Sequence, residues 1–458
     1  MLKLRRMKRY LTHAEVLDIV KQHEINLQRD RKLERYYRNE NDINRVRKAN
    51  GKANHHCSHP FAHQIVSTMS SYFMSKSVKL SLTNEQQNEQ LVDFLRYNDF
   101  DKVLMEVTEN VGVYGNGAIM TFIDGNGLVR FASVNPTEII VIVNNDVLEE
   151  IHTVIRTWYC ESNDGSNVHY VEVYDDKEVR KFYVDEHEIF NEVVEQHYFN
   201  DVPFTIFQAN QQNMSLFERV IPLIDSYDLL QSETLNLVSD LTDAILLIAG
   251  VELTEEQMQG VNQLRLLNVT DIEDGLDVRY ITKEVASNEE TKQRLRDDIF
   301  SLSMICDVNS DSFGEATSGT ALKIKMSSME FIAGMMESYF RLSIRRLVEL
   351  WANIVQLTHG ISVDEVVKDL QMQFTRNYIQ NDKEQIENAM ALSTLLSQET
   401  VIGILQDFIQ DVPTELERIE NEKQANIEFQ QDSFMSHEED EEEEEEVDEP
   451  VVDVEEDE

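Results

Sequence analysis

Residues 311–326 of the chain read DSFGEATSGTALKIKM. The stretch includes the end of a polar segment, 307–319, and it carries two lysines, Lys323 and Lys325, just beyond that segment. Amphipathic periodicity precedes the polar segment over 289–306 and follows it for about 37 residues, which corresponds to roughly 55 Å of helix. Because helices of this length need neighbours along their whole extent, the pattern predicts a bundle, a coiled coil or an oligomer.

A glycine-containing loop in front of a helix can cradle a phosphate group. A Walker-type loop has the spacing GxxxxGK[ST] and follows a strand, so that backbone N–H groups and a lysine meet the phosphates. Here Gly314 and Gly319 have the required spacing, but Thr320 replaces the lysine and a helical segment precedes the loop. The sequence therefore disfavours a nucleotide site and leaves two interpretations, a solvated connection between helices or a long functional loop.

Outward from this loop the hydrophobic period changes. Residues 117–207 contain several short apolar runs, beginning with the hairpin signal AIMTFID-GNG-LVRFASV, and these predict an antiparallel sheet. Near the N-terminus, Thr12 and Glu15 have the spacing of a helix capping box. The fold class predicted is α+β and mostly helical, with helical periodicity in the segments 8–50, 61–75, 90–113, 222–248, 289–306 and 383–410.

The charge of the chain is unevenly distributed. At 458 residues the chain allows roughly three domains, and its net charge of −45 argues against ordinary sequence-specific DNA binding. Residues 1–50 hold 14 Lys and Arg against 7 Asp and Glu, whereas 438–458 hold 16 acids and no base. A basic start, an acidic body and a hyperacidic tail indicate several different partners, and the tail is expected to be disordered.

The cysteines and the apolar runs indicate the redox compartment and whether a membrane span is expected. Cys57, Cys160 and Cys306 are far apart, which excludes a disulfide framework and favours a reducing compartment. No apolar run approaches 18 residues, so a membrane span is not expected.

Three further patterns were weighed as sites. In GVYGNG (112–117) the order is helix, glycines, strand, which predicts a turn into the sheet rather than a dinucleotide site. No motif for catalysis stands out, and with 86 acids in the chain chance carboxylate pairs are common, so neither an enzyme nor a cofactor is predicted. A metal is not predicted either, because no second ligand pair stands at zinc-finger spacing from the one cluster of zinc-ligand types, His55, His56, Cys57, His59 and His63.

Several stretches, taken together and in this order, resemble the portal proteins of tailed bacteriophages, in particular those of long-tailed phages of Gram-positive hosts. The resemblance covers about residues 10–420. It is carried by ERYYRNENDI (34–43), ANGKANHHCSHPFAHQIVSTMSSYFMSKSVKLS (49–81), VGVYGNGAIMTFID (111–124), VRFASVNPTEIIVIV (129–143), FERVIPLIDSYDLLQSE (217–233), SGTALKIKMSSME (318–330), FTRNYIQNDKEQIENAMAL (374–392) and SQETVIGIL (397–405).

The resemblance implies the portal fold, with long stem helices, an α/β wing, a small clip and a helical crown, assembled as a ring. The boundaries it implies are a wing over 1–217, a stem helix over 218–249, a clip over 250–287, a second stem helix over 288–306, a tunnel loop over 307–319, a long helix returning to the wing over 320–374, a crown over 375–430 and an acidic tail over 431–458.

The same resemblance implies where DNA passes. The tunnel loop projects into the channel of the ring, and its candidate residues are Asp311, Ser312, Phe313, Gly314, Glu315, Ala316, Thr317, Ser318 and Gly319, with Lys323 and Lys325 behind them. Duplex DNA carries one negative charge per roughly 1.7 Å of axis, so a largely acidic tunnel keeps it from adhering. A few cations, for which Lys292, Arg294 and Arg296 are further candidates, would centre the DNA by screened attraction.

The function implied is that of a conduit without catalysis. Double-stranded DNA is packaged through the ring by terminase and later ejected, and the ring joins head to tail. The partners implied are a ring of 12 subunits, the terminase large subunit, a head-completion adaptor, and the major capsid and scaffolding proteins, at the portal vertex of the virion and in the host cytoplasm during assembly. Two alternatives stay open, a non-viral helical scaffold protein and a metal-dependent nucleic-acid enzyme that uses the His/Cys cluster.

Overall fold

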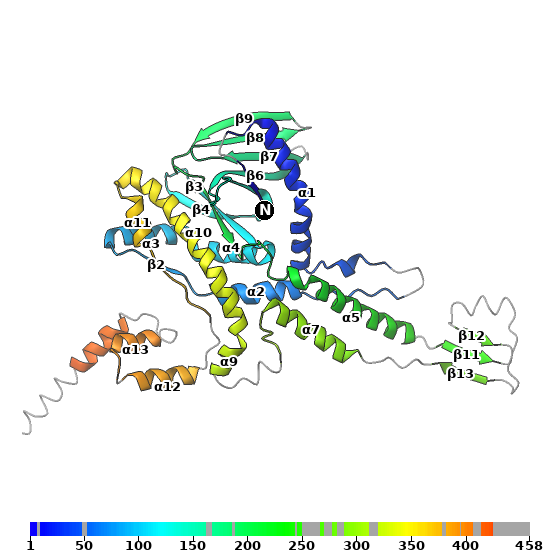
Figure 1. Cartoon of the computed structure of the whole chain (residues 1–458). Coiled ribbons are helices and arrows are strands. Elements are labelled where there is room, and N and C mark those ends of the chain that lie inside the picture. The colour runs from blue at the N-terminus through cyan, green and yellow to red at the C-terminus, as the bar shows by residue number, and fades with distance from the viewer. Residues whose placement is uncertain are drawn as a thin grey trace, which may run out of the picture. The chain divides into compact units, whose positions relative to one another are not determined.

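The computed structural model describes residues 1–6, 10–47, 53–161, 167–185, 188–242, 245–249, 266–269, 277–281, 288–310, 319–377, 382–393, 395–405 and 414–424 (Figure 1). The chain divides into two compact units. The first comprises Met1–Gly314 and Lys323–Tyr378, and the second comprises Glu315–Leu322 and Ile379–Glu458.

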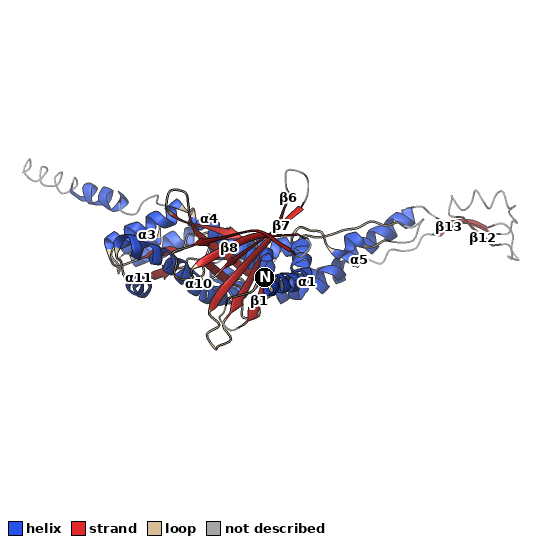
Figure 2. Ribbon diagram, turned by 90° about the horizontal axis from the view of Figure 1, so that it is seen from above, coloured by secondary structure: helices blue, strands red, loops and turns tan. Residues whose placement is uncertain are grey.

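A six-stranded sheet with the order β1-β5-β6-β7-β8-β9 forms one layer of the first unit (Figure 2). Strands β5 to β9 pair antiparallel, as predicted for 117–207. Strand β1 pairs parallel to β5 and was missed, because its four residues are basic and apolar in alternation and carry no turn signal. The strands are β1 (Leu2–Arg5), β5 (Ile139–Val143), β6 (Ile151–Glu161), β7 (Asn167–Tyr174), β8 (Glu178–Asp185) and β9 (Glu188–Gln196).

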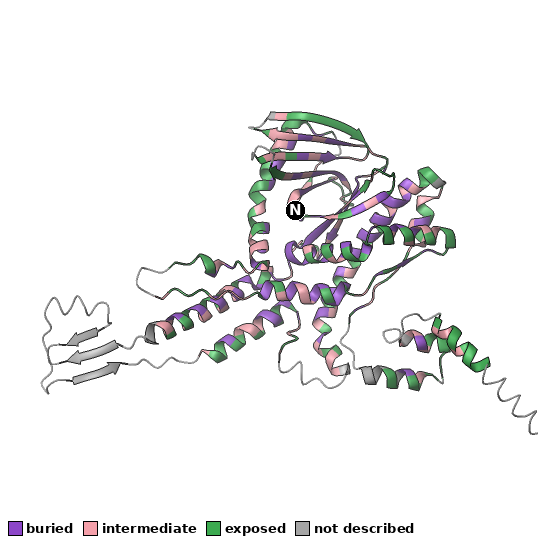
Figure 3. Cartoon of the chain, turned by 180° about the vertical axis from the view of Figure 1, so that it is seen from behind, coloured by how far each residue is buried: buried purple, intermediate pink, exposed green. Residues whose placement is uncertain are grey.

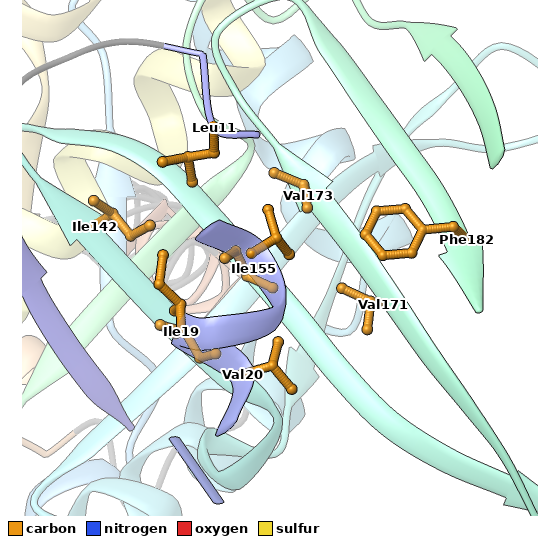
Figure 4. Packing of buried hydrophobic residues seen from close by; sticks show 10 residues of the cluster. Leu11, Ile19, Val20, Ile142, Ile155, Val171, Val173 and Phe182 are labelled. Carbon is orange, nitrogen blue, oxygen red and sulfur yellow. The ribbon is translucent and has the colours of Figure 1, made fainter. Parts of the chain in front are cut away.

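Helix α1 (His13–Tyr37) covers one face of this sheet. Figure 4 shows Ile19 and Val20 of α1 packed toward Ile155 and Val171 of the strands. The predicted capping box is confirmed, since the Thr12 side chain accepts from the Glu15 N–H and the Glu15 carboxylate accepts from the Thr12 N–H.

A second, three-stranded sheet, β10-β3-β4, packs against the other face of the six-stranded sheet. Its strands are β3 (Asn116–Ile123), β4 (Val129–Val134) and β10 (Phe204–Gln208). The predicted hairpin is confirmed, with Ile123 opposite Val129. At the entry to β3, Gly115 has a φ of +83°, and a Cβ there would lie 2.1 Å from the Asn213 carbonyl oxygen, so this position requires glycine. The interpretation of GVYGNG as a turn is thereby confirmed.

Three helices lie between α1 and β3 in sequence, and one expectation about them is wrong. The expected single helix 90–113 is two helices, because Asp99 has a φ of +48° and turns the chain between them. The helices are α2 (Phe61–Met74), α3 (Glu85–Tyr97) and α4 (Phe100–Tyr114), with 3₁₀ turns η1 (Asp42–Arg45), η2 (Pro136–Glu138) and η3 (Glu218–Val220) elsewhere.

The predicted stem helix 218–249, with its helical run 222–248, is wrong in its last part. Helix α5 covers Ile221–Thr242, and Ile245–Ala249 is strand β11 instead. The apolar run ILLIA fits a buried strand as well as a helix, and periodicity cannot separate the two over five residues. Pairing decides it, since β11 pairs parallel with β12 (Leu266–Val269) and antiparallel with β13 (Asp277–Ile281).

Helix α7 (Glu289–Ser303) runs beside α5, in contact with it (Figure 1). It ends earlier than the predicted 306, because Met304 adopts a φ of +59°. The predicted long helix is present as α9 (Gly319–Lys325) and α10 (Ser327–His359), with a break at Met326. The chain then returns through α11 (Val363–Asp369) to β14 (Gln371–Gln373), which pairs antiparallel with β2 (Lys79–Ser81).

The second unit contains α12 (Asp382–Leu392) and α13 (Gln398–Ile404), so helices in 383–410 are confirmed where that range is described. The acidic tail lies outside the described residues. Within the described residues, no helix combines the length and the apolar character that a membrane span needs.

Candidate nucleic-acid interface

The predicted tunnel loop is described at its two ends only. Asp307 to Ser310 and Gly319 are described, whereas Asp311, Ser312, Phe313, Gly314, Glu315, Ala316, Thr317 and Ser318 lie outside the described residues. The evidence for a loop site therefore comes from its base, where α7 ends and α9 begins.

An ion pair fixes the N-terminal side of the loop base. The Arg296 guanidinium of α7 donates from Nε, at 2.9 Å, and from Nη2, at 2.6 Å, to Asp307 Oδ2. Asp307 Oδ1 also accepts from the Asn309 N–H at 3.1 Å, and the Ser310 N–H donates to the Asp307 carbonyl. A nearly buried carboxylate that binds a planar guanidinium in this way is a strong, directional contact, so the chain leaves α7 in one defined direction.

A second contact joins the residue that precedes the loop to the last residue of α9. The Cys306 thiol donates to the Lys325 carbonyl at 3.5 Å. Burial, together with the nearby Asp307 carboxylate, raises the pKa of the Cys306 thiol, so the sulfur stays protonated and remains a donor. This contact fixes the end of α9 beside the residues that follow α7.

The five candidate cations differ in their surroundings. Lys292 is buried and bonds Glu289 at 2.8 Å, and Arg296 is bound to Asp307, so both serve contacts within the protomer. Arg294 is 85% exposed, with its Nε 4.0 Å from the nearest Asp298 oxygen. Lys323 is exposed and Lys325 half-buried. Arg294 and Lys323 are thus better placed to meet a polyanion than Lys292 and Arg296.

Helix α10 carries an apolar stripe that is exposed among the described residues. Phe331 is 70% exposed, and Met335 and Leu342 on the same side of the helix are also exposed. Figure 3 shows exposed and buried positions alternating along the long helices of this unit. Contiguous exposed apolar surface of this kind marks an interaction site.

The His/Cys segment, for which no metal was predicted, has a structural role that its sequence pattern does not indicate. Three buried polar side chains of α5, spaced four residues apart, bind alternate backbone N–H groups of the segment. The His59 N–H donates to Asp228 Oδ1 at 3.0 Å, the Cys57 N–H to Ser232 Oγ at 2.9 Å and the His55 N–H to Asn236 Oδ1 at 2.6 Å.

The spacing explains why this polar ladder works. Four helical residues rise about 6 Å, and two residues of extended chain rise about 6.6 Å, so the two repeats stay in register over three rungs. Asp228 also accepts from His59 Nδ1 at 2.7 Å and from Asn41 Nδ2 at 2.6 Å. The signal in the sequence is the polar set Asp228, Ser232 and Asn236 on an otherwise apolar stripe.

This geometry also bears on the alternative of a metal enzyme. In the part of the chain that the structure describes, no three His, Cys, Asp or Glu side chains gather in a way that could hold a metal ion. His59 is engaged with Asp228, and the backbone of the segment is used by α5.

Comparison with known proteins identifies the class. The family model "Phage portal protein, SPP1 Gp6-like" matches residues 17–428, and the chain belongs to this family. The portal protein of Bacillus phage SPP1 is 24% identical over 430 residues, which cover 86% of this chain and 84% of that relative. The portal protein of Clostridium phage phiCD119 is 26% identical over 392 residues, which cover 77% of this chain and 84% of that relative.

Among solved structures, a chain from the neck of an empty GTA particle has a TM-score of 0.40 and 11% identity, and the match covers 75% of this chain and 88% of the other. The expected resemblance is confirmed by the family and by both relatives, whose hosts are Gram-positive. The chain therefore has a phage portal role, in a family that is structural rather than enzymatic.

Proposed function

We propose that this chain closes into a ring at one capsid vertex and that double-stranded DNA passes through the ring during packaging and ejection. The observation that carries this proposal is the loop base at residues 306–325. The Arg296–Asp307 ion pair holds the chain where it leaves α7, and the Cys306 thiol holds the end of α9 through the Lys325 carbonyl, with Lys323 exposed nearby. Helices held in this way would stay fixed while the segment between them meets DNA.

The charge distribution suits a passage protein. The chain carries a net charge of −45, so a tunnel that it lines repels the phosphate backbone over most of its surface. Lys323, Lys325 and Arg294 are then sparse attractive points, whose reach is limited to about 8–10 Å at physiological salt. Weak contact of this kind lets the duplex slide, whereas many tight phosphate contacts would hold it.

The uncovered apolar surfaces support a ring of identical subunits. The stripe on α10, with Leu235 on α5, is exposed in the part of the chain that the structure describes and would be buried by a neighbour. When two different surfaces of one chain meet and the rotation closes, a ring results. We propose twelve subunits in the virion, with the wing over 1–217, the first stem helix shortened to end at residue 242, and the second stem helix shortened to α7, Glu289–Ser303.

The remaining assignments follow from the family. We propose that the clip, 250–287, meets the terminase large subunit during packaging and a head-completion adaptor afterwards. The wing and the crown, 375–430, would meet the major capsid and scaffolding proteins. We also propose that 307–319 is the tunnel loop and that 431–458 is the acidic tail.

Two measurements test this function. Electron microscopy of the purified chain should show rings with a central hole of DNA width, and filaments or compact monomers refute the ring. In a packaging assay, the double variant Lys323→Gln and Lys325→Gln should lower DNA uptake while rings still form. The matched control is Lys102→Gln, which removes an exposed lysine from α4 and should leave uptake unchanged. Equal uptake by both variants refutes the role of the loop-base lysines.

A further inference from the structure

The turn between β5 and β6 displays two aliphatic side chains to solvent. Val147 is 98% exposed and Leu148 is 77% exposed, although both belong to the ordered first unit. Single exposed apolar residues are ordinary on protein surfaces. An adjacent pair at the tip of a fixed turn forms a protruding apolar knob, and the question is what it enters.

Hydrogen bonds within the turn and ion pairs to β1 hold this knob in one conformation. The Asn144 N–H donates to the Glu150 carbonyl at 2.8 Å, and the Glu149 N–H donates to Asp146 Oδ1 at 2.9 Å. Glu149 has a φ of +50°, a left-handed conformation that is uncommon for a residue with a side chain. Its carboxylate is held by Lys3 at 2.6 Å and by Arg5, both on β1.

Strained backbone persists only when the surroundings impose it, and it concentrates at functional positions. Here β1 supplies both of the cations that hold Glu149. A turn that served only to connect two strands would not need an ion-paired brace from a third strand. The brace therefore keeps Val147 and Leu148 presented in one orientation.

The same chain carries an apolar groove of about 820 Å³ on a different set of elements, α3, the β3–β4 turn and the C-terminal half of α10. Phe94 and Trp351 line it, stacked with ring centroids 5.4 Å apart. Tyr97 and Leu128 add further apolar surface and are themselves about half exposed. Aromatic-lined, concave surfaces of this size are where binding energy concentrates when an apolar side chain enters.

We propose that the Val147–Leu148 knob of one protomer docks into the Phe94–Trp351 groove of the next protomer in the ring. This proposal rests on the proposed ring. A ring with a heterologous interface needs two unlike, complementary surfaces on each chain, and the knob and the groove are such a pair.

Charge supports the same occupant. Asp146 and Glu150 flank the knob, while Glu149 between them is neutralised by β1. Arg96 stands at the groove with its side chain 78% exposed. Asp93 also lines the groove, but at 3.9 Å it is too far for a hydrogen bond, so the Arg96 guanidinium keeps donors for a partner. An acid-flanked apolar knob therefore meets a groove that offers an available guanidinium, and complementary charge of this kind fixes orientation and register.

A disulfide test reads the contact directly. Leu148→Cys and Val355→Cys are combined in a background in which the exposed Cys160 is replaced by serine, and assembled rings are oxidised. A ladder of covalent multimers in denaturing gels, absent from each single-cysteine variant, supports the contact between neighbours. Monomer alone from intact rings overturns it. A compact, internally cross-linked monomer also overturns it, because the knob then reaches its own groove.

A second variant measures the contribution of the knob. Leu148→Asp should raise the protein concentration needed for ring formation at least tenfold, because a charge cannot enter the groove. Ile25→Asp, at another exposed aliphatic position on α1, is the matched control and should leave that concentration unchanged. An equal effect of both variants overturns the docking. Wild-type protein that forms no ring refutes the proposed function and this docking with it, whereas rings without the 148–355 cross-link refute the docking alone.

Discussion

The polar ladder on α5 should hold the extended segment 55–59 in place, and its three rungs should contribute unequally to the stability of that segment. Asp228→Ala removes the acceptor for three donors, the His59 N–H, His59 Nδ1 and Asn41 Nδ2. Ser232→Ala removes the acceptor for the Cys57 N–H only. The two variants therefore test whether the extended segment is held by the ladder and whether Asp228 is its strongest rung.

The magnitude follows from burial. Asn41 is buried, so losing its carboxylate partner costs roughly 1–3 kcal/mol, while each half-exposed His59 donor loses roughly 0.5–1.5 kcal/mol because water can replace the acceptor. The sum for Asp228→Ala is about 4 kcal/mol of local stability, against about 1 kcal/mol for Ser232→Ala. Since each 1.4 kcal/mol is tenfold, amide exchange in the segment should accelerate roughly a thousandfold in the first variant and about fivefold in the second.

Hydrogen exchange of the His55, Cys57 and His59 amides is the assay. The control is Ser226→Ala, also on α5, whose hydroxyl is exposed and donates to Pro222 of the same helix; it should leave the three amides unchanged. Acceleration of less than tenfold at His59 in Asp228→Ala would refute the reasoning. Equal acceleration by Asp228→Ala and Ser232→Ala would show that α5 itself is destabilised rather than the ladder.

Three further predictions concern the loop and the wing. Replacing Gly314 and Gly319 with proline should cut DNA packaging while rings still form, and normal packaging argues against a mobile loop. Arg296→Gln should lower packaging and speed proteolysis of the loop because Asp307 loses its bidentate partner, with Arg294→Gln as the paired control that should not speed proteolysis. Burial lowers the pKa of His23 below its unfolded value near 6.5. The neutral imidazole therefore stabilises the fold above that pH, and the stabilisation is lost as pH falls. His23→Gln, which keeps a donor for the Thr137 carbonyl, should flatten the decline in unfolding free energy between pH 7 and 5.

Patterns with a local cause could be predicted from the sequence. The capping box at Thr12, the hairpin between β3 and β4, the glycine turn at Gly115 and the long helix around α10 each depend on residues a few positions apart. The helix break at Asp99 and the strand β11 could not be predicted in the same way. The first depends on a left-handed backbone at a non-glycine residue, and the second on pairing with strands that are distant in sequence.

The candidate site also has features that depend on nearby residues and features that depend on distant ones. Its place between two amphipathic helical segments is a property of the local pattern, and the sequence predicts it; the helices that flank it are α7 and α9. The sequence does not show which cations are bound within the protomer. Arg296 is bound because it meets Asp307 across a turn, and Lys292 is bound because it is buried beside Glu289. The ladder needs α5 and a segment about 175 residues away, the separation between Cys57 and Ser232, to come together. No single-sequence pattern carries that information.

The three cations of α7 differ in whether a carboxylate of the same protomer binds them. Arg296 and Lys292 lie within one turn of helix of Arg294, yet both are bound to carboxylates of the same protomer. This arrangement fixes the loop base without adding attraction for DNA, because a paired guanidinium presents little net charge. Of the five candidate cations, Arg294 and Lys323 are the exposed ones, and under the proposed function they would meet the DNA against an acidic body. Neutralising Asp307 alone, as Asp307→Asn, would release Arg296 and add one unpaired cation per subunit on α7 beside Arg294. If the duplex is held loosely by design, that variant should slow DNA exit from filled particles and make exit more sensitive to salt, whereas unchanged exit would show that charge at this level does not control passage.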